Sequence, residues 1–151
     1  MQHILHAERI TVDEIASELG FNLKVKLSEE DWDVIFKESL GRLDIALKDK
    51  AIVIIDATNL YRSFRNKLRE IAEKRDARSC TIFVDTPRNI VMKRHNIPKE
   101  RHAVQDEELE QPLAEMQPPT EDENVYMIRN EQDLTATIKK LEAVRRGKIR
   151  T

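Results

Sequence analysis

The sequence contains few residues that form covalent crosslinks or unusual backbone turns. Its 151 residues include one cysteine, Cys80, and three glycines, at positions 20, 41 and 147. A single cysteine excludes an internal disulfide bond. The glycines are too few and too far apart to form the loop G-x-x-x-x-G-K-[ST], whose backbone N–H groups bind nucleotide phosphates. A chain of this length usually forms one domain and buries about two thirds of its surface.

Long apolar runs and an excess of charge of one sign are also missing. No segment approaches the roughly 18 apolar residues of a membrane span, and no signal-peptide pattern is present. The 26 Lys and Arg nearly cancel the 28 Asp and Glu, so no overall field would attract nucleic acid or an acidic membrane. We therefore expect a cytoplasmic protein with no membrane partner, in which any bound anion is held by a local site.

Strand and helix patterns alternate along the chain. Continuous apolar runs predict strands at 51–55, 80–84 and 125–128. Helical spacing of apolar residues predicts helices at 28–48, 60 to about 75, 86 to about 95 and 106–116, and a last one through Leu134, Ile138, Leu141 and Val144. The alternation predicts an α/β fold in which a parallel sheet has helices on both faces, giving three layers in a single domain over residues 1–151.

The segment between the second and third predicted strands is long, polar and rich in proline. In compact domains, an excursion of this length is usually a lid or a binding segment, although a solvated surface loop has a similar composition. We therefore expect a lid at about residues 95–122.

Two aspartates directly follow predicted strands. Because ligands of open parallel sheets bind beyond the carboxyl ends of the strands, Asp56 and Asp85 should project at the same edge. An aspartate there can hold Mg²⁺ directly or through water, or it can accept N–H groups of the following turn. Thr58 and Asn59 add polar groups beside Asp56 and favour a metal role, whereas the Asp-Thr-Pro sequence at Asp85 is explained by a helix start.

Several segments resemble small P-loop kinases of the polynucleotide-kinase-like ATP-binding family, which is of AAA type. They are VIIDATNLYRSFRNKLREIA, TIFVDTPRNIVMKRH, LAEMQPPTEDE and ITVDEIASELGF. The resemblance covers roughly residues 5–130. It implies a P-loop kinase-like fold, use of ATP and Mg²⁺, and phosphoryl transfer to an acceptor such as a nucleic-acid end or a small hydroxyl compound.

The resemblance implies a role for two aspartates. Asp13 would be the general base that hydrogen-bonds the attacking hydroxyl and takes its proton, and Asp56 would lie near the magnesium ion. Without the resemblance, Asp13 is simply a helix N-cap residue ahead of EIASEL.

The resemblance also implies roles for an asparagine and four arginines. Asn59, Arg62 and Arg65 would lie on the substrate side. Arg94 and, in the lid, Arg101 would neutralise charge that develops on the transferred phosphoryl group. Without the resemblance, Arg62 and Arg65 are solvated residues on the polar face of a helix.

The sequence departs from the family pattern in two places. Ala16 stands where the family often has an arginine, and the phosphate loop is missing together with the strand before it; MQHILHAERI resembles the later part of the helix that follows this loop. In the family, the missing strand lies between those matching 51–55 and 80–84. These two strands should then pair directly or expose unpaired edges, which favours self-association. We expect weak or absent ATP binding, either because the sequence is a fragment or because it is a reduced relative.

Two other functions compete with an active kinase. A catalytically inactive interaction module would keep the same fold. VIIDATNLYRSF also resembles the first metal-site motif of NYN/PIN-type ribonucleases. In that case Asp56 and Asp85 of this chain would hold a divalent metal.

Overall fold

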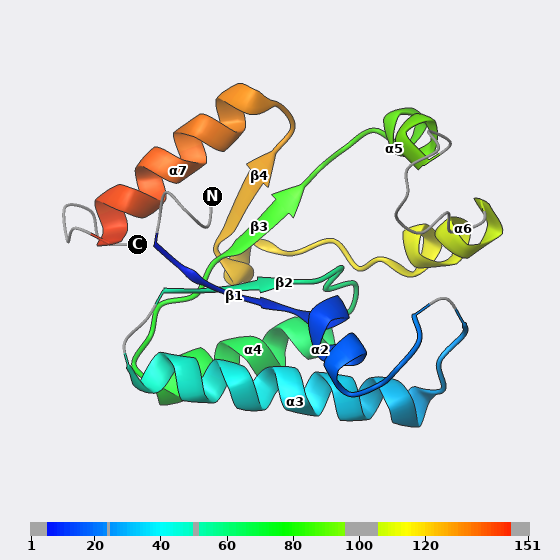
Figure 1. The fold of residues 1–151 in the computed structure, drawn as a ribbon. Helices are drawn as coiled ribbons and strands as arrows, with labels where there is room; N and C mark the ends of the chain where they lie inside the picture. Colours follow the sequence, from blue (N-terminus) through cyan, green and yellow to red (C-terminus); the bar gives the residue numbers. More distant parts are fainter. Residues whose placement is uncertain (1–5, 24, 50–51, 96–105, 146–151) are drawn as a thin grey trace.

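The computed structural model describes residues 6–23, 25–49, 52–95 and 106–145. Its strands are β1 (Glu8–Thr11), β2 (Val53–Asp56), β3 (Thr81–Val84) and β4 (Val125–Ile128). Its helices are α2 (Val12–Glu18), α3 (Glu29–Lys48), α4 (Arg62–Lys74), α5 (Arg88–His95), α6 (Asp106–Glu115) and α7 (Glu131–Arg145), with a 3₁₀ turn, η1 (Glu121–Glu123), before β4 (Figure 1). None of these helices has both the length and the apolar character that a membrane crossing needs.

The strands form two parallel two-stranded sheets. β1 pairs with β2 from Glu8 opposite Val53 to Thr11 opposite Asp56. β3 pairs with β4 in the same parallel sense. The α/β fold with parallel strands is therefore confirmed. Within the described residues β2 and β3 do not pair with each other, so of the two arrangements expected for these strands, the structure shows the separated one.

Separation of the sheets leaves main-chain groups on the second edge of β2. Glu8 N–H donates to the carbonyl of Ile52 at 2.8 Å. Because successive residues of a parallel strand direct their N–H and C=O groups to opposite edges, Val53 and Ile55 direct theirs away from β1. No strand among the described residues pairs with that edge. Self-association through such edges remains a prediction.

The sequence does not predict β1. The helical interpretation of MQHILHAERI is wrong for its last three residues, since Glu8 to Ile10 belong to a strand, while the segment's first five residues lie outside the described part of the chain. β1 has only four residues, and two of them are charged and exposed. The stabilising contacts come instead from the ladder with β2 and from Ile10, which is only 5% exposed.

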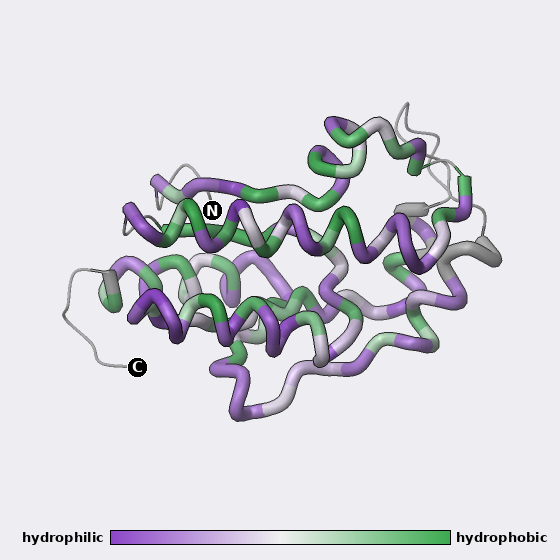
Figure 2. The backbone as a smooth tube through the Cα atoms, turned by 90° about the horizontal axis from the view of Figure 1, so that it is seen from below, coloured by the Kyte–Doolittle hydropathy of each residue, from purple (hydrophilic) through white to green (hydrophobic). Residues whose placement is uncertain are grey.

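Helix α3 packs against the first sheet and confirms the helix predicted at 28–48. It begins with a capping box: Ser28 Oγ accepts the N–H of Asp31, and the Asp31 carboxylate accepts the N–H of Ser28. Figure 1 shows α3 and α4 on one side of β1 and β2, with α7 beside β4, and Figure 2 shows apolar and polar residues alternating along the helices. One cluster of buried apolar residues in the core consists of Ile10, Val12, Ile15, Ala16, Ile35 and Leu43.

Candidate active site at the carboxyl ends of the strands

The carboxyl ends of β1 and β2 bring the two predicted catalytic aspartates to one edge. Thr11, the last residue of β1, lies opposite Asp56 in the ladder. Helix α2 begins at the next residue and carries Asp13 in its first turn. Both aspartates are exposed. The N-cap of α2 is Thr11, so the N-cap interpretation of Asp13 is wrong and its carboxylate is available for another role.

Arg9 lies at the same edge and contacts two acids. Its Nη1 donates to Asp56 Oδ2 at 3.4 Å, and its Nη2 donates to Glu14 Oε1 at 2.8 Å. The three side chains are partly exposed, so these pairs add little to stability, but they place a positive charge beside the Asp56 carboxylate. The sequence does not single out Arg9, because its contact with Asp56 depends on the pairing of a strand that the pattern does not predict.

The turn after β2 has a constrained backbone. Asn59 has a φ of 47°, in the left-handed region that few residues other than glycine and asparagine adopt readily. Its Oδ1 is buried, as is the Oγ1 of Thr11, and neither atom has a hydrogen-bond partner among the described residues. Buried polar atoms without a partner are costly and often mark a site for water or a ligand. Both of these atoms belong to residues at the edge that carries Asp13 and Asp56.

Arg65 is buried, and the interpretation of it as a solvated residue is wrong. It is 5% exposed, and its partner Glu123 is 2% exposed. Nε and Nη2 donate to the two carboxylate oxygens of Glu123 at 2.6 and 2.9 Å. Nη1 donates to the carbonyls of Asn59 and Leu60 at 2.9 and 3.2 Å. Every guanidinium nitrogen of Arg65 therefore has a protein acceptor.

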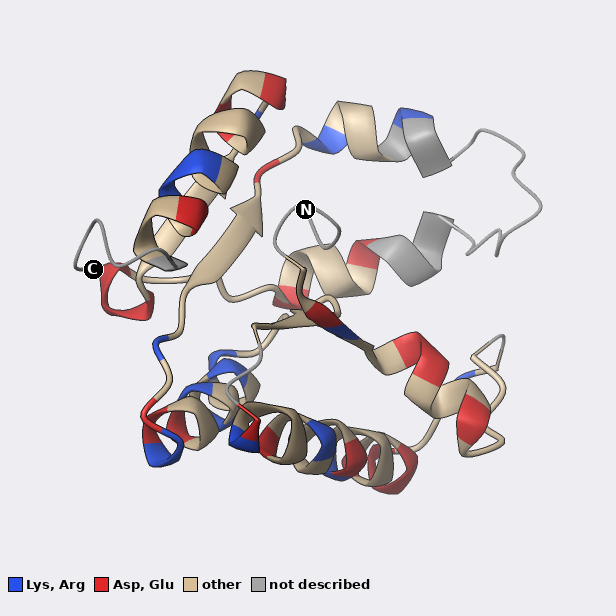
Figure 3. Cartoon of the chain, turned by 60° about the vertical axis from the view of Figure 1, so that its left-hand side comes forward, with Lys and Arg blue, Asp and Glu red and all other residues tan. Residues whose placement is uncertain are grey.

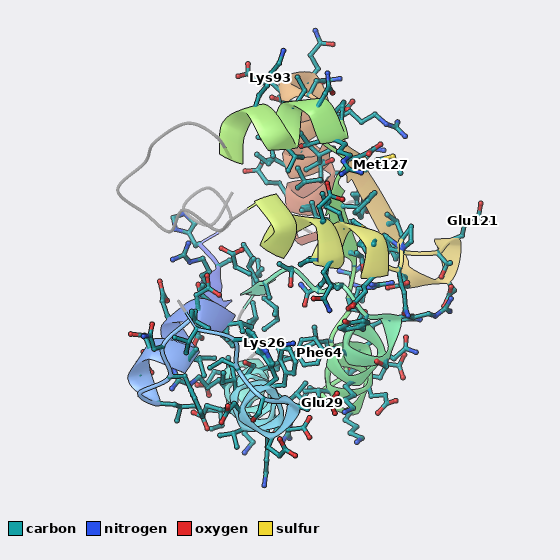
Figure 4. All side chains as sticks on the ribbon, turned by 90° about the vertical axis from the view of Figure 1, so that its right-hand side faces the viewer. Lys26, Glu29, Phe64, Lys93, Glu121 and Met127 are labelled. Atoms are coloured by element: carbon teal, nitrogen blue, oxygen red, sulfur yellow. The ribbon has the colours of Figure 1, made fainter. Side chains whose placement is uncertain are left out.

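Arg62, the first residue of α4, connects the N-terminal end of this helix to the residues before β4. These residues, 115–123, are called the return segment below. Arg62 Nη1 donates to Thr120 Oγ1 at 2.8 Å, and its Nη2 donates to Asp122 Oδ2 at 2.7 Å. Arg69, one turn further along α4 than Arg65, also donates to Asp122. Figure 4 views α4, α6 and the loop that carries Glu121 from the side.

The buried ion pair makes stability depend on pH. Hydrogen bonds from Arg65 lower the pKa of the Glu123 carboxyl, although burial opposes this. A lowered pKa in the folded state means that the stabilisation is complete above the pKa of an unfolded glutamate, about 4.3. It is lost as the pH falls through the folded value.

We expect the stability difference between the wild type and Glu123→Gln, measured by urea unfolding, to be largest near pH 7. It should narrow as the pH falls below about 4.3, because only the wild type has this carboxylate to protonate. A difference that stays constant from pH 7 to pH 3 would contradict the charged pair.

The other predicted acid, Asp85, lies on the second sheet. It follows β3, and its Oδ2 accepts Arg129 Nε at 3.0 Å. Asp56 and Asp85 thus belong to separate sheets, and each has its own arginine. The part of the chain that the structure describes contains no group of three or more His, Cys, Asp or Glu able to hold a metal.

A magnesium ion does not require such a cluster. It is usually held by one or two carboxylates, with water and substrate phosphates as the other ligands. Asp56 suits this role because its carboxylate is more than half exposed at the strand end. Figure 3 shows acidic and basic residues interspersed along α3 and α4, so the charges at the strand ends are a local feature.

The two remaining predicted residues lie partly or wholly outside the described residues. Arg94 belongs to α5, but its side chain is outside the described part. Arg101 is outside it altogether. The structure thus brings Asp13 and Asp56 to one edge and Arg62 and Arg65 into contact with the return segment, while the roles of Arg94 and Arg101 stay predictions.

Residues 1–119 match a protein family described as an AAA domain. Among curated proteins, the chain is similar to the L-seryl-tRNA(Sec) kinase of Methanococcus maripaludis, with 36% identity over 68 residues, or 44% of this chain and 27% of that protein. The match therefore spans about a quarter of the relative's length.

Two solved structures have a similar fold. A sugar kinase from Janibacter sp. HTCC2649 has a TM-score of 0.68 at 19% identity, covering 93% of this chain and 83% of that one. A gluconokinase from Sinorhizobium meliloti 1021 has a TM-score of 0.64 at 17% identity, covering 93% and 81%. At these identities the likeness shows the fold alone.

Proposed function

Because the chain belongs to the AAA-domain family of P-loop kinases, we propose that it is part of an ATP-dependent phosphotransferase that acts on a hydroxyl group. The observation that supports this most is the placement of Asp13 and Asp56 at one edge, set by the pairing of Thr11 with Asp56 and by the start of α2. A base and a metal-binding carboxylate at the ends of neighbouring strands suit in-line attack on a bound phosphate.

In this proposal Asp13 accepts the proton of the attacking hydroxyl. Its exposed position leaves the carboxylate accessible to a substrate. Asp56 is the protein ligand of magnesium, whose charge would offset that of the ATP phosphates. Asn59 and the partly exposed Arg62 lie toward the acceptor. Arg94, in α5, and Arg101, in the lid at about 95–122, neutralise charge that develops on the transferred phosphoryl group.

The acceptor is proposed only as a hydroxyl compound. The relative with the higher sequence identity is by name a kinase of a charged tRNA, whereas the two solved structures are by title a sugar kinase and a gluconokinase. The small net charge of −2 provides no general attraction for RNA. A tRNA acceptor would therefore have to be recognised through local contacts.

Two alternatives carry different weight. A kinase-like module without catalysis is favoured by one observation, the absence of a G-x-x-x-x-G-K-[ST] loop from the 151 residues. The ribonuclease hypothesis has less support, because the family match and both similar folds are kinase-like. The separate arginine partners of Asp56 and Asp85 also count against a metal shared by these two acids.

Nucleotide binding tests the proposal. We expect residues 1–151 to show no change in melting temperature with millimolar Mg-ATP, because a few arginines cannot replace the aligned N–H groups and lysine of a phosphate loop. Where the coding region encodes a strand and phosphate loop before residue 1, the protein made from it should show a shift of about 5–10 °C. This corresponds to about 2.7 kcal/mol at one hundred times the dissociation constant.

The outcomes of that experiment separate the candidates. A shift only in the full-length protein supports the phosphotransferase, and no shift in either protein supports the non-catalytic module. A saturable shift in residues 1–151 that Arg94→Ala abolishes would show that the nucleotide binds without a phosphate loop, contrary to the proposal.

A further inference from the structure

The contacts of Arg65 reach the turn that carries two proposed site residues. One nitrogen, Nη1, donates to the successive carbonyls of Asn59 and Leu60. Two neighbouring carbonyls can point at one donor only if the chain bends between them. Asn59, with its left-handed φ of 47°, turns the chain immediately before the first of these carbonyls. The hydrogen bonds from Arg65 to the carbonyls of Asn59 and Leu60 help to hold this conformation.

Asp56 and Asn59 are the two ends of this turn. Asp56 is fixed by its ladder position opposite Thr11. Asn59 is fixed by Arg65, and the carbonyl of Leu60 also accepts the N–H of Gln117 at 3.0 Å. Loss of the hydrogen bonds from Arg65 would let the turn change conformation while β2 stayed paired with β1. The position of Asn59 relative to Asp56 would then change.

Glu123 accepts hydrogen bonds from the other two nitrogens of the Arg65 guanidinium, Nε and Nη2. Its carboxylate also accepts the N–H of Thr120 at 3.1 Å in the capping box of η1. Glu123 therefore has little freedom, and it lies two residues before β4. The pair thus connects the end of β2 with the start of β4, which belong to separate sheets.

We propose that Arg65 and Glu123 form a positioning pair that sets the backbone of residues 57–60 and thereby places Asn59 relative to Asp56 at the phosphoryl-transfer site. The inference rests on the proposed function, since it gives the pair a task at the same site. Neither residue touches a substrate; each acts through the turn.

The test compares two arginines of the same helix. Arg65→Lys keeps the charge but loses the planar fork that bonds Glu123 and both carbonyls. The matched control is Arg75→Lys: Arg75 caps the other end of α4 and donates to both carboxylate oxygens of Asp44 at 2.7 Å. If Arg65→Lys does not fold, Glu123→Gln, which keeps one acceptor oxygen for Arg65, takes its place.

Two NMR measurements serve as readouts. The coupling between the amide and α protons of Asn59 reports its φ, and line broadening by Mn²⁺ alone reports metal binding at Asp56, with Asp56→Asn as the control without a carboxylate. We expect Arg65→Lys to change the Asn59 coupling and to weaken Mn²⁺ binding about 10–100-fold, as loss of a residue that orients a metal ligand usually does. Arg75→Lys should leave both unchanged.

The readouts separate positioning from a purely structural role. If Arg65→Lys lowers the melting temperature but leaves the Asn59 coupling and the Mn²⁺ broadening as in the wild type, the positioning proposal is overturned. If Mn²⁺ does not broaden Asp56 even in the wild type, the metal role in the proposed function fails. The Asn59 coupling then decides whether the pair sets the turn: a change in Arg65→Lys supports it, and no change overturns it.

Discussion

Replacing Arg65 with methionine is expected to lower the free energy of unfolding by about 3–5 kcal/mol, since it leaves a buried carboxylate without its partner. The Glu123 side chain is fully buried, and Arg65 supplies two of its hydrogen bonds. The same change removes a donor from the carbonyls of Asn59 and Leu60. Urea denaturation at pH 7 measures the loss.

The control is Arg75→Met, which removes the exposed pair with Asp44 from the other end of α4. Exposed ion pairs contribute little, so this loss should be much smaller. The double variant Arg65→Met with Glu123→Leu should recover part of the stability, because no charge is then left buried. A loss for Arg65→Met no larger than for Arg75→Met would contradict the buried pair.

Replacing Asp13 with asparagine is expected to lower kcat of phosphoryl transfer in the full-length protein by about 10²–10⁴-fold, the usual contribution of a general base. Asparagine cannot take the proton of the attacking hydroxyl. The melting temperature should change little, since the Asp13 carboxylate is exposed and makes no hydrogen bond or ion pair with another residue in the described ranges.

The control lies on the same helix. Glu18→Gln changes an exposed carboxylate at the far end of α2, where it pairs with Arg42 at 2.7 Å. This variant should keep the wild-type kcat. Equal activity of Asp13→Asn and Glu18→Gln would remove Asp13 from the proposed chemistry.

The elements with long or strong sequence patterns could be predicted. α3 has 20 residues, a regular apolar stripe and a capping box encoded by Ser28 and Asp31. β4 was predictable at its observed bounds, because Val125–Ile128 is a short apolar run between polar segments. β1 was not, since four residues with two charged positions carry no strand pattern until β2 lies beside them.

The contacts that shape the candidate site join residues far apart in the sequence. Arg9 and Asp56 are 47 positions apart, and Arg65 and Glu123 are 58 apart. No local pattern predicts such pairs. One signal for Arg65 was present: it lies three residues before Leu68 and seven before Ala72, on the helix face that becomes buried. An arginine on an apolar face predicts a buried acidic partner, although not which acid.

Transfer of the γ-phosphate of labelled ATP tests the central claim most directly. The protein made from its full coding region would be incubated with Mg-ATP and with either tRNA or small sugars as acceptors, and the labelled product would be identified. The proposed function predicts label on a hydroxyl of one acceptor, with transfer strongly reduced in Asp13→Asn. ATP left unconsumed in the presence of both acceptor classes, or label released only as inorganic phosphate, would contradict it.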